Sequence, residues 1–536
     1  MECVASSTQL TDVPTRTSPS RAAGALVGLL AAGVTVGVGE LVAALVRPAA
    51  SPVIAVGNRF IVLTPEPVKR WAIKQFGTDD KHVLLTGIYL VLAVLAVLIG
   101  LLAVRSLRLG LAGVALLGVV GCYCALTANA AHGSDVLPSI VGALAGLATL
   151  TLLVRTLTGE PTTSGTLPAD RRRFLQGGLA GAGLAVLAGF GGRALQHRRF
   201  DASKARAAVQ LPAPVSGPDP RPSASPGAVG NAAVDNYDRG LTPVPFRTPA
   251  DRFYRIDTAL AVPQIDPVSW RLRITGMVSR PLTLTFADLL ARPLVERWIT
   301  LCCVSNEVGG ELIGNATFRG VLLADLLREA GISAEADQLV ASSSDGMTIG
   351  SPTAVVMDGR DAMLAVGMNG EPLTAEHGFP VRMVVPGLYG YVSACKWITE
   401  LRATTFADFS AYWVRGGWAA RGPVKLASRI DRPVPPGAVT VGTAVPVAGV
   451  AWDQHVGVSR VEVQVDDGPW QQAELAPVPS TDTWRQWVYL WTPTSAGQHR
   501  LRVRAFDANG VGQDETDTDP FPAGATGLHS VTVRAR

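Results

Sequence analysis

Apolar residues are concentrated in the first part of the chain, and an ordinary mixture of polar and apolar residues follows. Five apolar stretches in that first part are long enough, or nearly so, to cross a bilayer, which takes roughly 17–25 residues. They are Ala22–Val46, Val83–Val104, Leu109–Ala128, Val136–Val154 and Phe174–Leu195. The pattern predicts an all-α membrane region with five spans at residues 1–200.

Positive charges between these stretches predict their orientation. Arginines occur at Arg105–Arg108, between the second and third stretch, and at Arg155–Arg173, between the fourth and fifth. The Ala131–Asp135 turn has no Lys or Arg. By the positive-inside rule the N-terminus is cytoplasmic, so the chain is a multi-pass protein of the cell membrane, and everything after Leu195 is extracytoplasmic. The basic Arg47–Lys81 connection falls on the outer side, in mild conflict with this orientation.

The residues just before the fifth stretch carry a second signal. Arg171 and Arg172 are followed by one residue and then by Phe174 and Leu175, ahead of a weakly hydrophobic segment rich in Gly and Ala. This arrangement is typical of a twin-arginine export signal, a pathway that carries proteins already folded around a cofactor. The alternative is a plain cytoplasmic anchor of positive charge.

Three residues inside the apolar stretches have reactive side chains. Glu40 lies near the end of the first stretch, where an interfacial acid is the plain interpretation and a proton relay is the alternative. Cys122 and Cys124 lie inside the third stretch, where we expect a structural role. The chain has six cysteines, and their distribution does not indicate a disulfide framework.

The second half of the chain changes pattern. Residues 201–240 interleave Pro with Ala, Ser and Gly, which predicts a linker that builds no core and spaces the next domain from the membrane. Alternating runs at Trp270–Ile274 and Leu282–Phe286 predict strands, and an amphipathic pattern at Leu322–Ala330 predicts a helix. Without a regular βαβ rhythm, these elements indicate an α+β domain at residues 241–423.

A third pattern begins at about Val424. Short alternating runs such as Val445–Val450, Val461–Val465 and Leu501–Ala505 are separated by turn residues, for example at Asp466–Gly468. This spacing predicts an all-β sandwich of immunoglobulin type at residues 424–536. The segment contains no Cys, so it lacks the disulfide of antibody domains.

Composition agrees with a multidomain membrane protein. The 536 residues are too many for one core, and 48% hydrophobic against 17% charged residues is apolar for a soluble protein. The net charge of +4 is small and no basic block occurs, so we expect no nucleic-acid partner.

Two segments of the second half suggest chemistry. Cys302 and Cys303 precede a turn that contains Ser, Asn and Gly, where a cysteine can offer a soft thiolate to a metal that prefers sulfur. His377 and Arg382 lie five residues apart, and Lys396 follows. Cationic donors of this kind can bind a phosphate.

The order and surroundings of these residues resemble the sulfite oxidase family of molybdopterin enzymes, over roughly Thr248 to Arg536. The resemblance rests on an ordered series of motifs: Cys303 with Asn306, Asp345-Gly346, Met368–Leu373, His377–Arg382, Val384–Gly387 and Lys396-Trp397. It implies a molybdopterin-binding catalytic fold and a C-terminal sandwich that mediates dimerisation, so a homodimer is one expected assembly. It also implies a Mo-molybdopterin cofactor, with molybdenum bound by one cysteine.

The resemblance assigns roles residue by residue. The family places its metal ligand three residues before the Asn, which selects Cys303. The residues that match pterin-contacting positions are Tyr254, Arg255, Asp257, Asn306, Asp345, His377, Arg382, Ala394, Cys395 and Lys396. Alternatives remain for three assignments: a redox dithiol formed with Cys302, a turn histidine at His377, and a surface salt bridge at Arg255.

The chain departs from the family at the substrate positions. Sulfite oxidases carry an arginine directly after the Asn, where this chain has Glu307, and another early in the sandwich, where Ala451–Gly457 has none. An acid would repel sulfite, and a unit charge at about 4 Å is worth roughly 4 kcal/mol at an effective dielectric near 20. Glu307 is a candidate catalytic proton donor, and pairing with a nearby Arg is the alternative.

These inferences predict a membrane-anchored molybdopterin-dependent oxidoreductase with two-electron oxygen-atom chemistry on the extracytoplasmic side. The expected substrate is a small or protein-bound oxygen-atom donor or acceptor, such as a sulfoxide rather than sulfite. An electron-transfer partner is required, and a quinone-linked one is a candidate. The rivals are a membrane-held binding module without catalysis and a metal-free thiol protein that uses Cys302 and Cys303.

Overall fold

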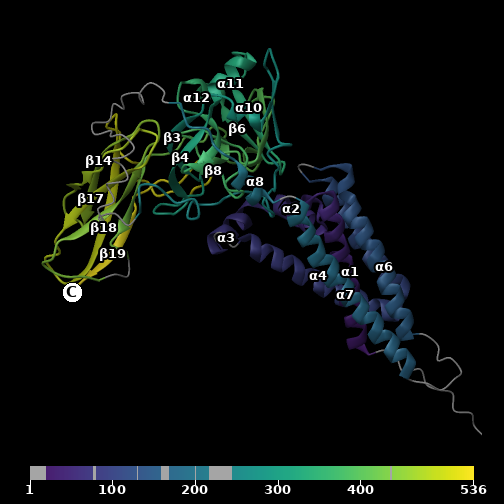
Figure 1. Cartoon of the computed structure of the whole chain (residues 1–536). Helices are drawn as coiled ribbons and strands as arrows, with labels where there is room; N and C mark the ends of the chain where they lie inside the picture. The colour runs from purple at the N-terminus through teal and green to yellow at the C-terminus, as the bar shows by residue number, and fades with distance from the viewer. Residues whose placement is uncertain are drawn as a thin grey trace, which may run out of the picture. The chain divides into compact units, whose positions relative to one another are not determined.

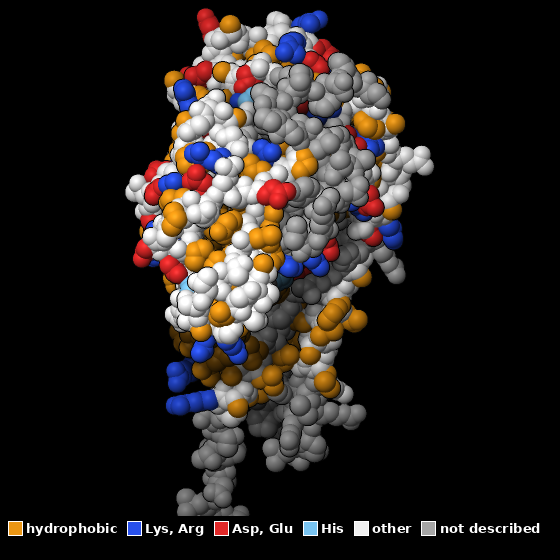
Figure 2. All heavy atoms as spheres, turned by 90° about the vertical axis from the view of Figure 1, so that its left-hand side faces the viewer, with side chains coloured by type: hydrophobic (Ala, Val, Ile, Leu, Met, Phe, Trp, Pro, Cys, Tyr) orange, Lys and Arg blue, Asp and Glu red, His pale blue; other side chains and the backbone are white. Residues whose placement is uncertain are grey.

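The computed structural model describes residues 20–76, 80–128, 131–158, 168–199, 201–215, 244–434 and 438–536. The chain divides into two compact units, residues 1–199 and residues 200–536. The first contains helices, and the second contains sheets with short helices (Figure 1). On the face seen in Figure 2, charged side chains are spread over the sheet-rich unit, whereas the helices show mainly apolar ones.

The helical unit is built around α1, which packs against α4, α6 and α7. Its helices are α1 Arg21–Val46, α2 Pro52–Leu63, α3 Glu66–Phe76, α4 Asp80–Arg105, α5 Leu107–Leu126, α6 Leu137–Thr158 and α7 Pro168–Arg199. Glycines allow α1 and α4 to approach closely. A Cβ atom on Gly28 would lie 1.9 Å from the carbonyl oxygen of Ala96, and one on Gly100 would lie 2.1 Å from that of Gly24. Small residues at such positions are typical of helices that associate in a membrane.

Four helices in the described part of this unit are long and apolar enough to cross a membrane: Arg21–Val46, Lys81–Arg105, Leu107–Leu126 and Gly133–Thr158. The prediction of five spans is therefore not confirmed. The fifth predicted stretch lies in α7, whose sequence has arginines near both ends and many glycines between them. The side chains of Arg171–Leu175 lie outside the described part, so the twin-arginine interpretation stays a prediction.

The α+β part of the second unit contains two sheets, in the order β2-β1-β10-β5-β6 and β3-β4-β7-β8, with β9 beside β7. The strands are β1 Arg271–Gly276, β2 Leu282–Thr285, β3 Val295–Cys302, β4 Ile313–Leu322, β5 Gln338–Ser343, β6 Thr348–Pro352, β7 Met363–Met368, β8 Glu371–Pro372, β9 Arg382–Val384 and β10 Ile398–Thr404. The helices are α10 Phe286–Leu290, α11 Leu323–Ala330, α12 Thr353–Met357, α13 Gly390–Ser393 and α14 Tyr412–Arg415. The strands predicted near Trp270 and Leu282 and the helix predicted at Leu322–Ala330 are confirmed.

The C-terminal part is a sandwich of two sheets, in the order β11-β13-β17-β16 and β12-β19-β18-β14-β15. Its strands are β11 Ala427–Arg432, β12 Ala438–Val439, β13 Val445–Trp452, β14 Val458–Val465, β15 Gln471–Gln472, β16 Glu474–Leu475, β17 Arg485–Trp491, β18 Gly497–Asp507 and β19 Ser530–Ala535. Inward-facing residues of both sheets, among them Val447, Val463 and Trp487, form its core.

The sandwich and the α+β part also share a core. Val450, Trp452 and Trp484 of the sandwich belong to the same buried cluster as residues of β1 and β3. The Trp484 indole donates a hydrogen bond of 3.0 Å to the carbonyl oxygen of Phe246. The two parts are therefore joined by apolar packing and not only by the chain.

The start of the predicted linker differs from the expectation. Residues Ala202–Ala208 form α8, capped by the Asp201 carboxylate, which accepts from the Ser203 backbone. Ala202 is 1% exposed and belongs to the cluster around Phe318. The Val215 backbone then donates 2.8 Å to the carbonyl oxygen of Leu294. The local Ala-rich sequence forms a helix that packs on the α+β part, so this segment does contribute to a core.

Candidate functional site

The end of β3 places the two adjacent cysteines in different surroundings. Cys302 belongs to the apolar core, and its thiol lies 3.5 Å from the carbonyl oxygen of Cys303. The backbone of Cys303 donates to Leu312, and its carbonyl oxygen accepts from Asn306 at 3.1 Å. The Asn306 side chain accepts from the Leu312 backbone at 2.8 Å. Asn306 therefore closes the turn that presents Cys303.

The Cys303 thiol is a latent metal ligand. Burial raises its pKa, and hydrogen bonds from the backbone and hydroxyl of Ser305 partly offset that rise. Burial raises the pKa of Cys302 much further, and the neighbouring Cys303 adds to it. Both are free thiols. A metal ligand must be a thiolate, and Ser305 favours that form at Cys303.

Tyr254 lies close to the cysteines. Its ring stacks on Phe253, with centroids 5.3 Å apart. Burial raises the pKa of the Tyr254 phenol well above its ordinary value, and the charges of Cys303 and Cys302 raise it further. A Cβ atom on Gly390 would lie 3.7 Å from both the Tyr254 hydroxyl and the Cys302 carbonyl oxygen, and 3.8 Å from Ala394. The predicted Tyr254 and Ala394 therefore lie together beside the Cys303 turn.

A buried carboxylate links two of the predicted cations. Asp257 has a side chain that is 3% exposed, and it accepts from Arg255 at 3.0 Å and from Lys396 at 2.5 Å. Lys396 also donates to the carbonyl oxygen of Glu376 and lies 4.8 Å from the Trp397 ring centroid. The salt bridge considered for Arg255 does exist, but its partner is buried. Asp257 therefore holds Arg255 and Lys396 in place and leaves one net positive charge.

His377 and Arg382 are both buried in the same region. The His377 Nε2 lies 2.8 Å from the Ala250 carbonyl oxygen, and burial together with the charge of Arg382 lowers the His377 pKa to about 4. A neutral ring that donates from Nε2 has Nδ1 free of a proton. Gly378 brings this turn against Lys396, because a Cβ atom there would lie 3.2 Å from the Lys396 Cα.

Arg382 is a buried cation that makes no ion pair with a described residue. It is 5% exposed, its Nη1 donates to the His377 carbonyl oxygen at 3.3 Å, and its Nε has no hydrogen-bond partner. Burial lowers the pKa of Arg382 to about 10. A buried guanidinium is costly without an anion. The phosphate end of a pterin would satisfy it, so the donor set fits the cofactor that the resemblance implies.

Asp345 and Cys395 lie near one another, since the charge of Asp345 acts on the Cys395 thiol. The Asp345 carboxylate accepts from the Thr258 hydroxyl at 3.3 Å and from the Met347 backbone at 3.2 Å. Burial raises the pKa of the Cys395 thiol, and the charge of Asp345 raises it further. Cys395 is therefore a protonated buried thiol, and its backbone carbonyl accepts from Met383.

Glu307, the candidate proton donor, is exposed on the Cys303 turn. Its catalytic role stays a prediction. In the sandwich segment expected to hold a family arginine, the Gln454 amide donates to Thr300, and His455 pairs with Asp482 at 3.2 Å. The Gln454 side chain therefore lies at the junction between the two parts.

Sequence reasoning missed residues of the sandwich that contact the Cys303 turn. Arg429, 7% exposed, donates from Nη1 to the Gly310 carbonyl oxygen at 2.7 Å and pairs with Asp431. The His529 ring covers Gly309, since a Cβ atom on that glycine would lie 2.3 Å from the ring. No local sequence signal connects Arg429 or His529 with a turn more than one hundred residues away.

Comparisons with known proteins agree with this geometry. Residues 259–413 match the Oxidoreductase molybdopterin binding domain family, and residues 428–503 match the Bacterial Ig domain family rather than the expected dimerisation domain. The chain is 34% identical over 157 residues to the uncharacterized oxidoreductase YuiH of Bacillus subtilis, which covers 29% of this chain and 76% of that protein.

The chain also resembles two more distant proteins. The chain is 31% identical to mitochondrial sulfite oxidase of Homo sapiens over 46% of this chain, and it spans about half of that protein, 53%. The sulfane dehydrogenase SoxCD of Paracoccus pantotrophus is 25% identical, with a TM-score of 0.47, over 54% of this chain and 81% of that one. With the domain match and the extent of the YuiH similarity, the chain belongs to the molybdopterin-binding oxidoreductase family.

Proposed function

We propose that this protein is a membrane-anchored, molybdopterin-dependent oxidoreductase that transfers an oxygen atom in a two-electron reaction on the extracytoplasmic side. The observation that carries the proposal is the buried Arg382 guanidinium, whose Nε has no hydrogen-bond partner. Arg382 and the Cys303 thiol both lie near Tyr254, since the charges of both shift the pKa of its phenol. The four apolar helices support the membrane anchor. The guanidinium and the thiol together argue for a cofactor with an anionic end and a thiolate-bound metal.

Each residue of the site then has a task. Cys303 would bind molybdenum, and the bound cofactor would supply the two-electron oxygen-atom chemistry. Arg382 and His377 would bind the phosphate end, with His377 taking up a proton as the anion approaches. Arg255 and Lys396, held by Asp257, would position the pterin.

The substrate is proposed to be a neutral oxygen-bearing molecule, such as a small or protein-bound sulfoxide, rather than sulfite. An anionic substrate needs converging cations. Arg429, a sandwich cation that contacts the Cys303 turn, is committed to Asp431 and Gly310, and the turn carries the acidic residue Glu307. A neutral substrate does not need cations at this turn.

Two measurements test this proposal. Elemental analysis of the purified full chain should give about one molybdenum per chain, as expected for one ligating cysteine per site. The absence of molybdenum would favour the binding-module or thiol-protein rivals. Steady-state assays should show turnover of methionine sulfoxide with an artificial electron donor and poor turnover of sulfite. Efficient sulfite oxidation with a micromolar KM would contradict the proposed substrate class.

A further inference from the structure

The helical unit contains an apolar cavity of about 540 Å³ bounded by α1, α2, α4, α5 and α6. Ala31 of α1, Val53 of α2, Leu95 of α4 and Leu117 of α5 are among the residues that line it. The close contact of α1 and α4 at Gly28 lies at its edge. Such a cavity suits an apolar chain, and its volume is within the range of small-molecule sites.

A second cavity, of about 470 Å³, adjoins the first and lies among α1, α4 and α7. The two share Ala32, Val36 and Leu92 in their walls. The second cavity is lined by Glu40 and Tyr89 in addition to apolar side chains. Its walls therefore include a carboxylate and a phenol, which an acyl chain does not need.

Polar groups gather at one end of the first cavity. The Ser139 hydroxyl lines that cavity, is 5% exposed as a residue, and has no hydrogen-bond partner. Pro138 and Pro52 line the same cavity and lie close together, since a Cβ atom on Gly39 would be 3.1 Å from Pro52 and 3.3 Å from the Pro138 carbonyl oxygen. Ser51, next to Pro52, donates to the Glu40 carboxylate at 2.5 Å. An unsatisfied buried hydroxyl is unfavourable, so Ser139 indicates a ligand that carries a hydrogen-bond acceptor.

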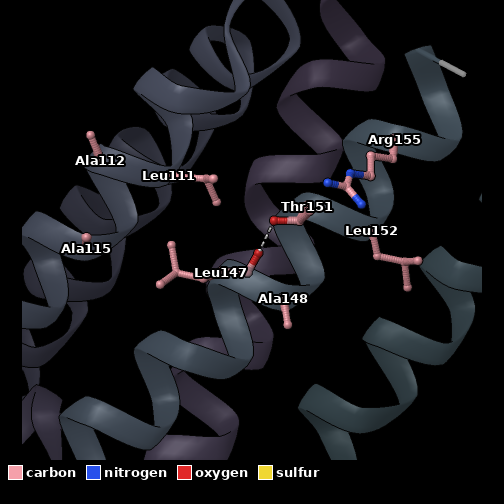
Figure 3. A pocket seen from close by; sticks show the side chains of 8 residues that line it. All are labelled: Leu111, Ala112, Ala115, Leu147, Ala148, Thr151, Leu152 and Arg155. Carbon is pink, nitrogen blue, oxygen red and sulfur yellow. Dashed lines mark hydrogen bonds between the residues drawn. The ribbon is translucent and has the colours of Figure 1, made fainter.

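A nearby groove lacks this feature. The groove between α5 and α6 measures about 680 Å³, and Leu and Ala side chains form most of its wall. Its Thr151 hydroxyl donates 2.7 Å to the Leu147 carbonyl oxygen, as the dashed line in Figure 3 shows. That hydroxyl is satisfied within its own helix, and Arg155 is a charged side chain in the same wall. This groove therefore lacks an unsatisfied hydroxyl like that of Ser139.

We propose that the paired cavities bind a lipid-soluble quinone. One quinone oxygen would accept from the Ser139 hydroxyl, the isoprenoid tail would lie along the apolar walls, and Glu40 would accept a proton on quinol oxidation. An acyl chain has no oxygen to offer Ser139. The redox role rests on the proposed function. The quinol would give two electrons to the molybdenum site, one proton to Glu40 and one proton to water, and reduction of one sulfoxide to one sulfide and one water would consume two electrons and two protons.

The binding test uses the full chain in nanodiscs and decylubiquinone as the probe. Leu117→Trp fills the first cavity and should weaken binding by at least about tenfold, because the tail loses its buried contacts. Leu116→Trp is the matched control, since Leu116 is 64% exposed on the same helix. It should leave the dissociation constant within about twofold, as expected of a surface substitution. No binding by the parent chain, or equal binding by both variants, would overturn the proposal.

The polar contact is tested by Ser139→Ala, with Ser134→Ala as the exposed control on the preceding turn. Loss of one hydrogen bond should weaken decylubiquinone about fivefold in the first variant only. If Ser139→Ala has no effect and a saturated phospholipid displaces the probe equally well, the cavities hold lipid and the proposal is wrong. Molybdenum content is unchanged in every variant, so a failure here is distinct from failure of the proposed function.

The proton role is tested by Glu40→Gln. This variant should bind decylubiquinone within about twofold, yet oxidise decylubiquinol at least about tenfold more slowly when sulfoxide is the acceptor. An unchanged rate of decylubiquinol oxidation in Glu40→Gln would show that Glu40 is not the proton acceptor. Binding is measured without turnover, so the quinone site can be judged even if sulfoxide is not the substrate.

Discussion

Cys302 and Cys303 are adjacent in sequence but serve different purposes. The side chain of Cys302 belongs to the core of the α+β part, while Cys303 is held in a turn by Asn306 and receives hydrogen bonds from Ser305. β3 ends at Cys302, and Cys303 is the first residue after the strand. Position relative to the end of the strand, rather than residue type, separates the structural thiol from the proposed ligand.

Replacing Cys303 tests this difference. Cys303→Ser should lose molybdenum and lower turnover by more than about 100-fold, because a hydroxyl is a poor ligand for a soft metal. Cys302→Ser should keep molybdenum and most of the activity, with a modest loss of stability from the buried hydroxyl. Elemental analysis and turnover of both variants give the answer, and the reverse pattern would assign the metal to Cys302.

His377 should make the cofactor-free chain sensitive to acid. Its pKa is about 4 in the folded chain against 6.5 for a free histidine, so between these values the unfolded chain binds the extra proton. Stability is therefore present above about pH 6.5 and is lost as the pH falls towards 4, by up to about 3 kcal/mol. Thermal unfolding of cofactor-free protein at pH 7.5 and 5 should show it, and His377→Gln should reduce the difference between the two melting temperatures. An unchanged difference in that variant would assign the effect to other groups, such as His529, whose pKa is also about 4.

Some residues of the site could be predicted from the sequence, and others could not. His377, Arg382 and Lys396 carry a local charge pattern, and the structure brings them together. The motif predicts Glu307 as a candidate catalytic acid, whereas its exposure is a property of the folded turn and could not be predicted from the motif. Arg429 reaches that turn from another domain, and only tertiary packing reveals it.

The strands of the α+β part were easier to predict than helix α8. Alternation indicated the strands near Trp270 and Leu282, because a half-buried strand shows its two faces directly in the sequence. α8 was missed, since Pro-rich composition around it suggested a linker. Its short run of Ala, Lys and Arg is a good helix former, and burial of Ala202 then stabilises the helix in place.

The packing of α8 can be tested with two equivalent substitutions. Ala202→Asp puts a charge into the cluster around Phe318 and should lower the free energy of unfolding of the second unit by about 2–4 kcal/mol. Ala207→Asp introduces the same charge on the exposed side of the same helix and should cost less than about 1 kcal/mol. Tryptophan fluorescence during urea unfolding measures both, and equal values would show that α8 is not held by its apolar contact.

At the scale of the whole molecule, the proposed extracytoplasmic location of the second unit can be tested at the basic residues near the start of α7. If Arg171 and Arg172 form a twin-arginine signal, changing both to Lys should block export of residues 200–536 and leave the preceding helices inserted. Protease digestion of intact spheroplasts measures whether residues 200–536 are accessible from outside. If digestion of the Lys variant is unchanged, Arg171 and Arg172 act only as a positively charged anchor and not as an export signal.

The contacts of Arg429 and His529 with the Cys303 turn limit how this chain can be recombined. A hybrid that joined the α+β part to the sandwich of another protein would lose the donor to Gly310 and leave a gap over Gly309. The turn that presents Cys303 would then lose its contacts with the sandwich, even with every residue of the α+β part intact. We therefore expect the two parts to be exchangeable between proteins only together, because a substitution in the sandwich can alter the proposed metal site.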